Sequence, residues 1–307
     1  MISLAHRTQY AALRATVRAL QRLSWRRAGD VGALLGTVGY RPLGVRRHVV
    51  ERQLAAAFPE LSPAAVQRVA RAAYEHLGRV TIEAALVPSL GSAGVLALFD
   101  EPSGWEHVEA ARAAGRGMLL VSGHIGNWEL GGAYIAARGI GIDVVARRMG
   151  NPLFDAYVTE TRTQLGMQVV YDADAVRRIP RATREGRAVA LLVDQGVKGL
   201  ASSYVPFFGR PAKTPRGPAV FALRLGVPTI FAAVLRQPSG RYRFFFEPVA
   251  VEHTGDRERD TDAIVAGYTA QLERFVCRAP EQYFWHHRRW KRQPADTPAA
   301  LRDPVLR

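Results

Sequence analysis

From about residue 104 onward the chain alternates short β-branched runs with stretches of helical periodicity. We expect strands at 118–121, 143–146, 168–171, 188–193, 229–235 and 242–248, and helices at 127–138, 153–165, 175–185 and 218–225. Alternation of this kind is typical of an α/β fold. We therefore predict a central mixed, mostly parallel sheet flanked by helices, with ligands at the carboxyl ends of its strands.

The first hundred residues predict helices only. A helix over 45–58 is followed by a turn and by a helix that Ser62 caps and Pro63 opens. We see no internal repeat and no long linker. We expect three segments: a helical, membrane-associating region at 1–100, an α/β domain at 101–293, and a C-terminal tail at 294–307.

The charge indicates a partner of negative charge. The chain has 42 Lys and Arg against 27 Asp and Glu, a net charge of +15, and three of the basic residues are lysine. Arginine forms forked contacts with phosphate and carboxylate groups, which suits an anionic membrane, an acidic protein or nucleic acid. The sequence lacks a helix-turn-helix and an aromatic-lined basic module, so we expect no nucleic acid. A non-catalytic basic protein that binds membranes or nucleic acid is the alternative of a different class.

The N-terminal stretch has the pattern of an amphipathic helix. Tyr10, Leu13 and Val17 share one face with Leu20, and the opposite face gathers arginines. A basic helix of this type can lie in a bilayer interface, preferentially on the anionic cytoplasmic leaflet. A surface helix packed on its own domain is the other interpretation. Since no run reaches about 18 apolar residues, we do not expect a conventional spanning helix.

One segment has the pattern of a reactive site. The strand at 118–121 runs directly into Gly-His-x-Gly-Asn-Trp-Glu at 123–129, where Asn127 can cap the following helix and Glu129 falls in its first turn. In one continuous helix His124 and Glu129 would point about 140° apart, so they can meet only if His124 lies on a loop before the helix. A carboxylate would then fix the imidazole tautomer, and the other ring nitrogen would take a proton from a hydroxyl. The alternative is that both residues merely satisfy backbone groups at a strand–helix junction.

Several familiar sites are missing from the sequence. It contains no glycine-rich phosphate loop, no G-x-S-x-G and no H-E-x-x-H, and Cys277 is its single cysteine. We therefore expect no cofactor and no metal site.

Segment 123–129 resembles the His-x4-acid motif of the lysophospholipid acyltransferase superfamily, and more closely that of the bacterial lipid A biosynthesis lauroyl/myristoyl acyltransferases. Similar stretches lie at 53–62, 146–155, 205–218 and 280–292. The resemblance implies transfer of a fatty acyl chain from an acyl carrier protein thioester to a glycolipid hydroxyl, most naturally that of a lipid A precursor. It also implies that His124 is the general base and Glu129 its orienting partner. Acyl-CoA as donor and a phosphatidylinositol mannoside or another glycolipid as acceptor is the alternative.

The same resemblance extends to further residues. Arg162 and Asp194 match two other polar positions of the family's site; the alternatives are a solvated helix face for Arg162 and a turn or N-cap aspartate for Asp194. Asn127 is a candidate for shaping the turn or the oxyanion environment, with simple capping as the alternative. Candidates for contact with acceptor phosphates, with a solvated surface as the alternative, are Arg147, Arg148, Lys213 and Arg216.

Two aromatic groups complete the expectations. Phe207 and Phe208 are candidates for the acyl channel, with a buried core as the alternative. The aromatic and basic residues of 285–292 resemble an interfacial anchor. Together these features imply a peripheral or monotopic protein on the cytoplasmic face of the bacterial inner membrane.

Overall fold

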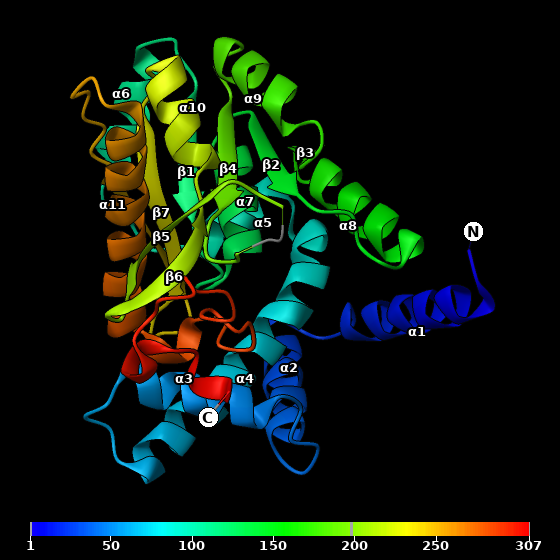
Figure 1. Cartoon of the computed structure of the whole chain (residues 1–307). Helices are drawn as coiled ribbons and strands as arrows, with labels where there is room; N and C mark the ends of the chain where they lie inside the picture. Colours follow the sequence, from blue (N-terminus) through cyan, green and yellow to red (C-terminus); the bar gives the residue numbers. More distant parts are fainter. Residues whose placement is uncertain (1, 197–198, 307) are drawn as a thin grey trace.

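A computed structural model describes residues 2–196 and 199–306 and confirms the α/β fold (Figure 1). Its centre is a six-stranded sheet with the order β3-β2-β4-β1-β7-β8. Neighbouring strands pair in parallel except β7 and β8, which are antiparallel. The strands are β1 Met118–Ser122, β2 Ile142–Ala146, β3 Met167–Tyr171, β4 Ala188–Leu192, β7 Thr229–Arg236 and β8 Tyr242–Pro248. All six expected strands are confirmed.

Helices cover both faces of this sheet. One face carries α6 (Trp105–Ala113) and α7 (Trp128–Ala137), whose apolar residues pack on β1, β7 and β8. The other face carries α9 (Ala175–Arg184), α10 (Gly217–Leu225) and the long α11 (Arg257–Arg278). Helix α8 (Pro152–Gln164) runs beside β3 (Figure 1). The helices expected at these places are confirmed to within about two residues, whereas α11 lies outside the expected set.

A second, two-stranded sheet occupies a stretch with no expected element. Strands β5 (Ser202–Phe207) and β6 (Arg210–Pro215) form an antiparallel hairpin. Phe208 and Gly209 at its tip both have positive φ, +51° and +67°, which suits a tight hairpin turn. The sequence does not predict this hairpin, because its strands contain prolines and its turn contains a phenylalanine. The usual signal of a hairpin is Asn-Gly or Asp-Gly between strands without proline.

The N-terminal region is helical as expected, with α1 Leu4–Leu20, α2 Trp25–Tyr40, α3 Arg47–Ala57, α4 Pro63–Leu86, η1 Val87–Leu90 and α5 Gly91–Ala97. Ser62 caps α4 as predicted. Helices α2 and α4 touch through their main chains: a Cβ on Gly36 would lie 2.0 Å from the Tyr74 carbonyl oxygen, and one on Gly78 would lie 2.0 Å from the Gly32 carbonyl oxygen. Only glycine permits the two helices to approach so closely. Because this side of α2 packs on α4, the opposite side of α2 faces the solvent.

The helical region and the sheet share one hydrophobic core. Leu54 of α3 and Tyr74 of α4 belong to the same buried cluster as Ile125, which follows β1, and Trp285. The end of the chain packs on this region as well: η2 (Pro280–Gln282) contacts α4 and η4 (Pro304–Leu306) contacts α3, with η3 (Ala299–Leu301) between them in the chain. The N-terminal helices therefore support the loop that follows β1.

The apolar stripe of α1 packs partly against the rest of the protein, with Val17 and Leu20 buried and Tyr10 and Leu13 half-buried. Leu20 is buried with Ile82 and Leu86 of α4, and the Tyr10 ring lies 6.3 Å from the Tyr157 ring of α8. For this stripe the interpretation as a helix packed on its own domain is the one observed. Among the described residues one helical run, Pro63–Ala97, is long and apolar enough to cross a bilayer; this is weak evidence, because buried core helices have the same composition.

Candidate active site

The loop between β1 and α7 is shaped by a glycine and an asparagine. Gly126 has φ +60°, and a Cβ there would lie 1.6 Å from the Val234 carbonyl oxygen, so this position admits only glycine. The Asn127 side chain caps α7 by accepting a hydrogen bond of 3.0 Å from the Leu130 amide. The predicted cap is confirmed, Glu129 lies in the first turn of α7, and His124 stands on the loop before it.

Asp194 is the direct partner of the His124 ring. Nδ1 of His124 lies 2.7 Å from Oδ1 of Asp194, and the main-chain amide of His124 donates to Oδ2 at 3.0 Å. Asp194 follows β4, the neighbour of β1 in the sheet, and is only 2% exposed. In the neutral ring Nδ1 then carries the proton, which leaves Nε2 as the basic nitrogen.

This pairing sets the charge of both groups. Burial works to raise the pKa of Asp194, but the charge and hydrogen bonds of His124 outweigh it and lower that pKa to about 2. Burial works to lower the pKa of His124, but the Asp194 carboxylate outweighs it, so the pKa is raised above its ordinary value. Asp194 is therefore ionised at neutral pH and stabilises the imidazolium that forms when His124 takes a proton.

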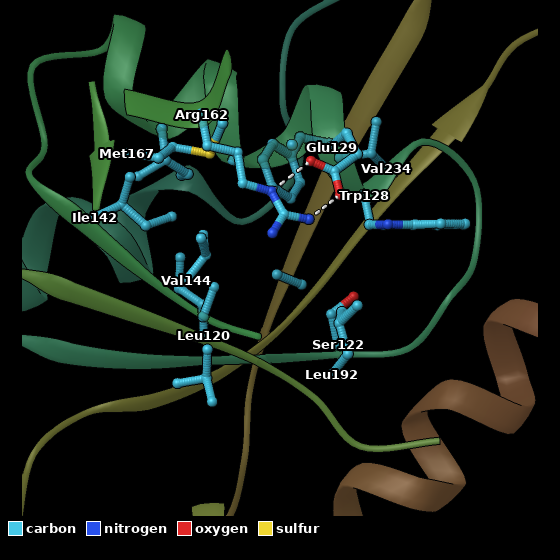
Figure 2. Close-up of a pocket in the computed structure, with 17 residues that line it drawn as sticks. Leu120, Ser122, Trp128, Glu129, Ile142, Val144, Arg162, Met167, Leu192 and Val234 are labelled. Atoms are coloured by element: carbon cyan, nitrogen blue, oxygen red, sulfur yellow. Dashed lines mark hydrogen bonds and ion pairs between the residues drawn. The ribbon is translucent and has the colours of Figure 1, made fainter. Parts of the chain in front are cut away.

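Glu129 is held by Arg162 and not by the His124 ring. Nε of Arg162 donates to Oε2 of Glu129 at 3.0 Å, and Nη2 donates to Oε1 (Figure 2). Burial lowers the pKa of Arg162, but Glu129 reverses this and leaves it raised. The expected contact between His124 and Glu129 is thus replaced by two pairs, because Glu129 turns from α7 toward α8 while the loop turns His124 toward β4. Glu129 acts on His124 only through its nearby charge.

An apolar cavity opens beside the Glu129–Arg162 pair, and Trp128 lies between it and His124. The cavity lies between α7 and the sheet and has a volume of about 670 Å³ including its open mouth. Trp128, Glu129 and Arg162 line it together with side chains that are almost all apolar (Figure 2). The His124 ring contacts the Trp128 ring with centroids 5.0 Å apart. The remaining lining residues are Leu120, Ser122, Gly131, Gly132, Ile135, Ile142, Val144, Val145, Met167, Ala190, Leu192, Ala232, Val234 and Phe244.

Two residues beside His124 were not expected from the sequence. The side-chain amide nitrogen of Gln195 lies 3.4 Å from each ring nitrogen of His124. The Phe284 ring lies 5.9 Å from the imidazole, and its main-chain amide donates to the His124 carbonyl oxygen at 3.0 Å. Gln195 follows Asp194 at the same strand end, a position that could have identified it. Phe284 comes from the far end of the chain and carries no such signal.

The chain matches the family of bacterial lipid A biosynthesis acyltransferases over residues 6–292. It belongs to this family. As a member it is an O-acyltransferase, and the match runs through the N-terminal helices as well as the α/β sheet.

Three relatives show the range of the likeness. The lipid A biosynthesis lauroyltransferase of Escherichia coli K12 is 28% identical over 271 residues, which cover 88% of this chain and 87% of the relative. The lipid A biosynthesis palmitoleoyltransferase of the same organism is 26% identical over 269 residues, 86% and 85% of the two chains. The phosphatidylinositol mannoside acyltransferase of Mycobacterium tuberculosis is 30% identical over 224 residues, 71% and 68% of the two chains.

The four basic residues expected to contact phosphate lie in two places. Arg147 and Arg148 line a surface hollow with Tyr171 at the ends of β2 and β3. Lys213 lies on β6. It is beside Gly196, the residue two positions after Asp194. Arg216 is bound to the carboxylates of α11, with Nη2 2.7 Å from Glu258 and 3.3 Å from Asp262. Arg147 and Arg148 are well exposed, so they suit an outside anion better than Arg216.

The aromatic residues expected at a channel and at a membrane form a core instead. Phe207 is fully buried, contacts the rings of Phe208 and Trp290, and does not line the cavity beside Glu129. Trp285 and Trp290 are also fully buried, so they do not form an interfacial anchor. The tight β5–β6 hairpin folds this part of the chain over the C-terminal segment, and the rings fill the space between them. Among the residues that the structure describes, no group of three His, Cys, Asp or Glu side chains could hold a metal ion.

Proposed function

We propose that this protein moves a fatty acyl chain from an acyl carrier protein thioester to a hydroxyl of a lipid A precursor, with His124 as the general base. The observation that carries this proposal is the ionised, buried Asp194 on Nδ1 of His124, next to an apolar cavity in a chain of this family. Asp194 takes the orienting role that the sequence suggests for Glu129. Glu129 and Arg162 form the polar wall of the cavity.

The chemistry follows from Nε2 of His124, the ring nitrogen that Asp194 does not hold. Nε2 takes the proton of the acceptor hydroxyl as its oxygen attacks the thioester carbonyl carbon. The carbon–oxygen bond forms and gives a tetrahedral oxyanion, for which we propose the side-chain amide of Gln195, 3.4 Å from Nε2, as a hydrogen-bond donor. The intermediate collapses, the carbon–sulfur bond breaks, and the leaving thiolate receives the proton from the imidazolium.

The cavity suits the acyl chain of the donor. Its lining is apolar apart from Ser122, Glu129 and Arg162, and burying a methylene is worth about 0.8 kcal/mol. A chain that lies between α7 and the sheet has its reactive end toward the polar wall. The Tyr171 hydroxyl donates to Asp155 at 2.7 Å, and both residues also contact Arg148. The Asp155 carboxylate also acts on Arg162, so a phosphorylated acceptor held by Arg147 and Arg148 lies near this wall.

Filling the cavity should shift the preference of the protein toward donors with shorter acyl chains. We expect Ala190→Leu to lower kcat/KM for the longest accepted acyl chain at least about 10-fold more than for the shortest, because each displaced methylene forfeits its burial. Rates with a series of acyl carrier protein thioesters measure this effect. Ala137→Leu is the matched control, since Ala137 is half-buried in α7 and does not line the cavity. An equal loss for all chain lengths would contradict the assignment.

A phosphatidylinositol mannoside acceptor with an acyl-CoA donor is the second candidate. The relative that bears the name phosphatidylinositol mannoside acyltransferase is 30% identical over 71% of this chain, against 28% over 88% for the lauroyltransferase. The test uses purified full-length protein, both classes of donor and both classes of acceptor, with the products identified by mass spectrometry. Acylation of the lipid A precursor from the carrier protein supports the proposal. Exclusive acylation of the mannoside, or transfer to neither acceptor, contradicts it.

The outer face of α2 is the membrane surface that we propose for a peripheral protein on the cytoplasmic face of the inner membrane. This face exposes Leu34, Leu35 and Val38, and the loop after it exposes Leu43 and Val45. Exposed arginines flank the apolar stripe at both ends, at 26–27 and at 41 and 46. An apolar stripe with basic borders matches an anionic bilayer, which accepts the leucines and attracts the guanidinium groups.

A charge in this stripe should weaken membrane binding. We expect Leu34→Glu to reduce the fraction of protein bound to anionic phospholipid vesicles several-fold, because a carboxylate opposes both burial and the lipid charge. Val176→Glu on α9 is the control, since Val176 is 65% exposed and Leu34 is 63% exposed. Co-sedimentation with vesicles measures the bound fraction. Equal losses in the two variants would show that α2 does not face the lipid.

A further inference from the structure

Glu83 is a buried carboxylate that the proposed reaction does not use, and it lies next to the reactive loop. Glu83 of α4 is 1% exposed. Its Oε2 accepts hydrogen bonds from the Asn127 side-chain amide at 2.9 Å and from the Tyr242 hydroxyl, and its Oε1 accepts one from Arg236. A carboxylate is stable in such a place only when it is paired. We call these four residues the Glu83 cluster.

The cluster fixes the orientation of one side chain in the reactive loop. Both ends of the Asn127 amide are used: Oδ1 accepts from the Leu130 amide at 3.0 Å, and Nδ2 donates to Glu83. An ionised carboxylate can only accept hydrogen bonds. Glu83 therefore holds the nitrogen of the amide toward α4 and leaves its oxygen for the helix cap.

Other contacts hold the main chain of the same loop. The Gly126 amide donates to the Gln282 carbonyl oxygen at 2.8 Å, and the Asn127 amide donates to the Val234 carbonyl oxygen at 3.0 Å. Nε2 of His76, which lies on α4 with Glu83, is 3.2 Å from the Gly126 carbonyl oxygen. Helix α4 thus contacts the loop twice, within a few residues of His124.

We propose that Glu83 is a positioning residue for His124: its carboxylate orients the Asn127 amide, so that the loop keeps the imidazole against Asp194. Glu83 itself has no place at the reacting atoms, because its carboxylate is hydrogen-bonded to Asn127, Arg236 and Tyr242. The kinetic part of this inference rests on the proposed acyl transfer. The structural part concerns the order of the loop alone.

The variant Glu83→Gln keeps the shape of the side chain and replaces one acceptor oxygen with a donor. The new NH2 group faces Asn127, Tyr242 and Arg236, which all donate hydrogen bonds to the carboxylate in the unmodified protein. We therefore expect the hydrogen bond that holds the Asn127 amide to be lost. We expect kcat to fall about 10–100-fold, as for other residues that orient a reactive group, with KM for the acyl donor unchanged. A kcat within about twofold of the unmodified protein, in a folded variant, would overturn the proposal.

Asp143 supplies the matched control. It is fully buried and bound to two half-buried arginines, Arg178 and Arg187, so Asp143→Asn also takes a buried carboxylate away from its arginine partners. Asp143 lies near the start of β2, at the amino ends of the parallel strands, whereas His124 lies at their carboxyl ends. We expect Asp143→Asn to lower thermal stability and to keep kcat. An equal fall of kcat in both variants would reduce the role of Glu83 to stability.

An exchange of donor and acceptor provides the rescue. In the double variant Glu83→Gln with Asn127→Asp, the new glutamine amide donates to the new aspartate, which still accepts from the Leu130 amide and restores the negative charge. We expect this pair of changes to recover kcat to within a few-fold of the unmodified protein. Recovery of thermal stability without recovery of kcat would overturn the positioning role.

A measurement of backbone order separates this inference from the proposed function. We expect hydrogen exchange at the Leu130 amide to be faster in Glu83→Gln than in Asp143→Asn, whether or not acyl transfer is observed. Equal exchange would overturn the proposal, whereas absence of acyl transfer by the unmodified protein would count against the proposed function alone. Should Glu83→Gln not fold, Tyr242→Phe removes one donor to the carboxylate and is expected to lower kcat a few-fold at constant KM; an unchanged kcat would overturn the proposal.

Discussion

His124→Ala is expected to lower the rate of acyl transfer by about 10²–10⁴-fold, the contribution typical of a general base. The change removes the nitrogen that we propose takes the proton of the acceptor hydroxyl. It leaves Asp194 its hydrogen bond from the main-chain amide of residue 124, so the fold should persist. Initial rates at saturating donor measure the loss, and circular dichroism at the assay temperature checks the fold.

The control for this variant is His253→Ala, which removes an exposed histidine. We expect it to keep the rate of the unmodified protein. A His124→Ala variant that retains near-normal turnover would remove the imidazole from the mechanism, and another group would then have to activate the hydroxyl.

Asp194→Asn is expected to have the second large effect, a fall of kcat of up to about 10⁴-fold. A loss of this size is found when the carboxylate that fixes the tautomer of a catalytic imidazole is replaced by an amide. The amide can donate to Nδ1, which would place the ring proton on Nε2, where the acceptor hydroxyl needs a base. The main chain keeps its place, because an amide oxygen can still accept from the backbone of His124. Single-turnover rates measure the loss without interference from product release.

The same variant should change the pH profile in a defined direction. In the unmodified protein burial works against the charged His124, but Asp194 outweighs it and raises its pKa. The base acts only when neutral, so the rate falls as the pH drops through this raised pKa. Without the Asp194 carboxylate, burial outweighs the smaller effect of the Glu129 charge, so the acid limb should move to lower pH while the plateau falls.

Glu129→Gln distinguishes the two carboxylates. Glu129 contributes least among the groups that set the pKa of His124, so its removal should leave the acid limb nearly in place. An acid limb that moves with Glu129→Gln and stays with Asp194→Asn would contradict the pairing in the structure and restore the pairing suggested by the sequence.

Part of the site could be predicted from local sequence because its signals are local. The strand at 118–121, the glycines of 123–129 and the cap at Asn127 lie within a dozen residues, and together they place His124 on a loop at a strand end. The partner of His124 could not be predicted in this way. Asp194 comes from β4, and only the strand order β4-β1 brings the two strand ends together.

Other interpretations failed where the partner of a side chain lies far along the chain. Phe207 and Trp290 have the composition of a channel or a membrane anchor, yet they fill a core between the β5–β6 hairpin and the C-terminal segment. The apolar stripe of α1 is likewise taken up by α4 and α8. Glu83 carried one local signal, a single acidic residue within the apolar run at 80–86, but its partners lie on β7, β8 and the loop after β1.

The sequence by itself determined the alternation of strands and helices, the helical N-terminal region and the place of His124 at the end of a strand, because periodicity, capping residues and glycines act over short distances. Only the tertiary structure decided which carboxylate contacts the imidazole, which surface stays apolar and exposed, and which residues line the cavity. These three features depend on strand order and on contacts between segments that are distant in the chain. The burial and the pairing of each side chain are set by residues of other segments, which its local sequence does not contain.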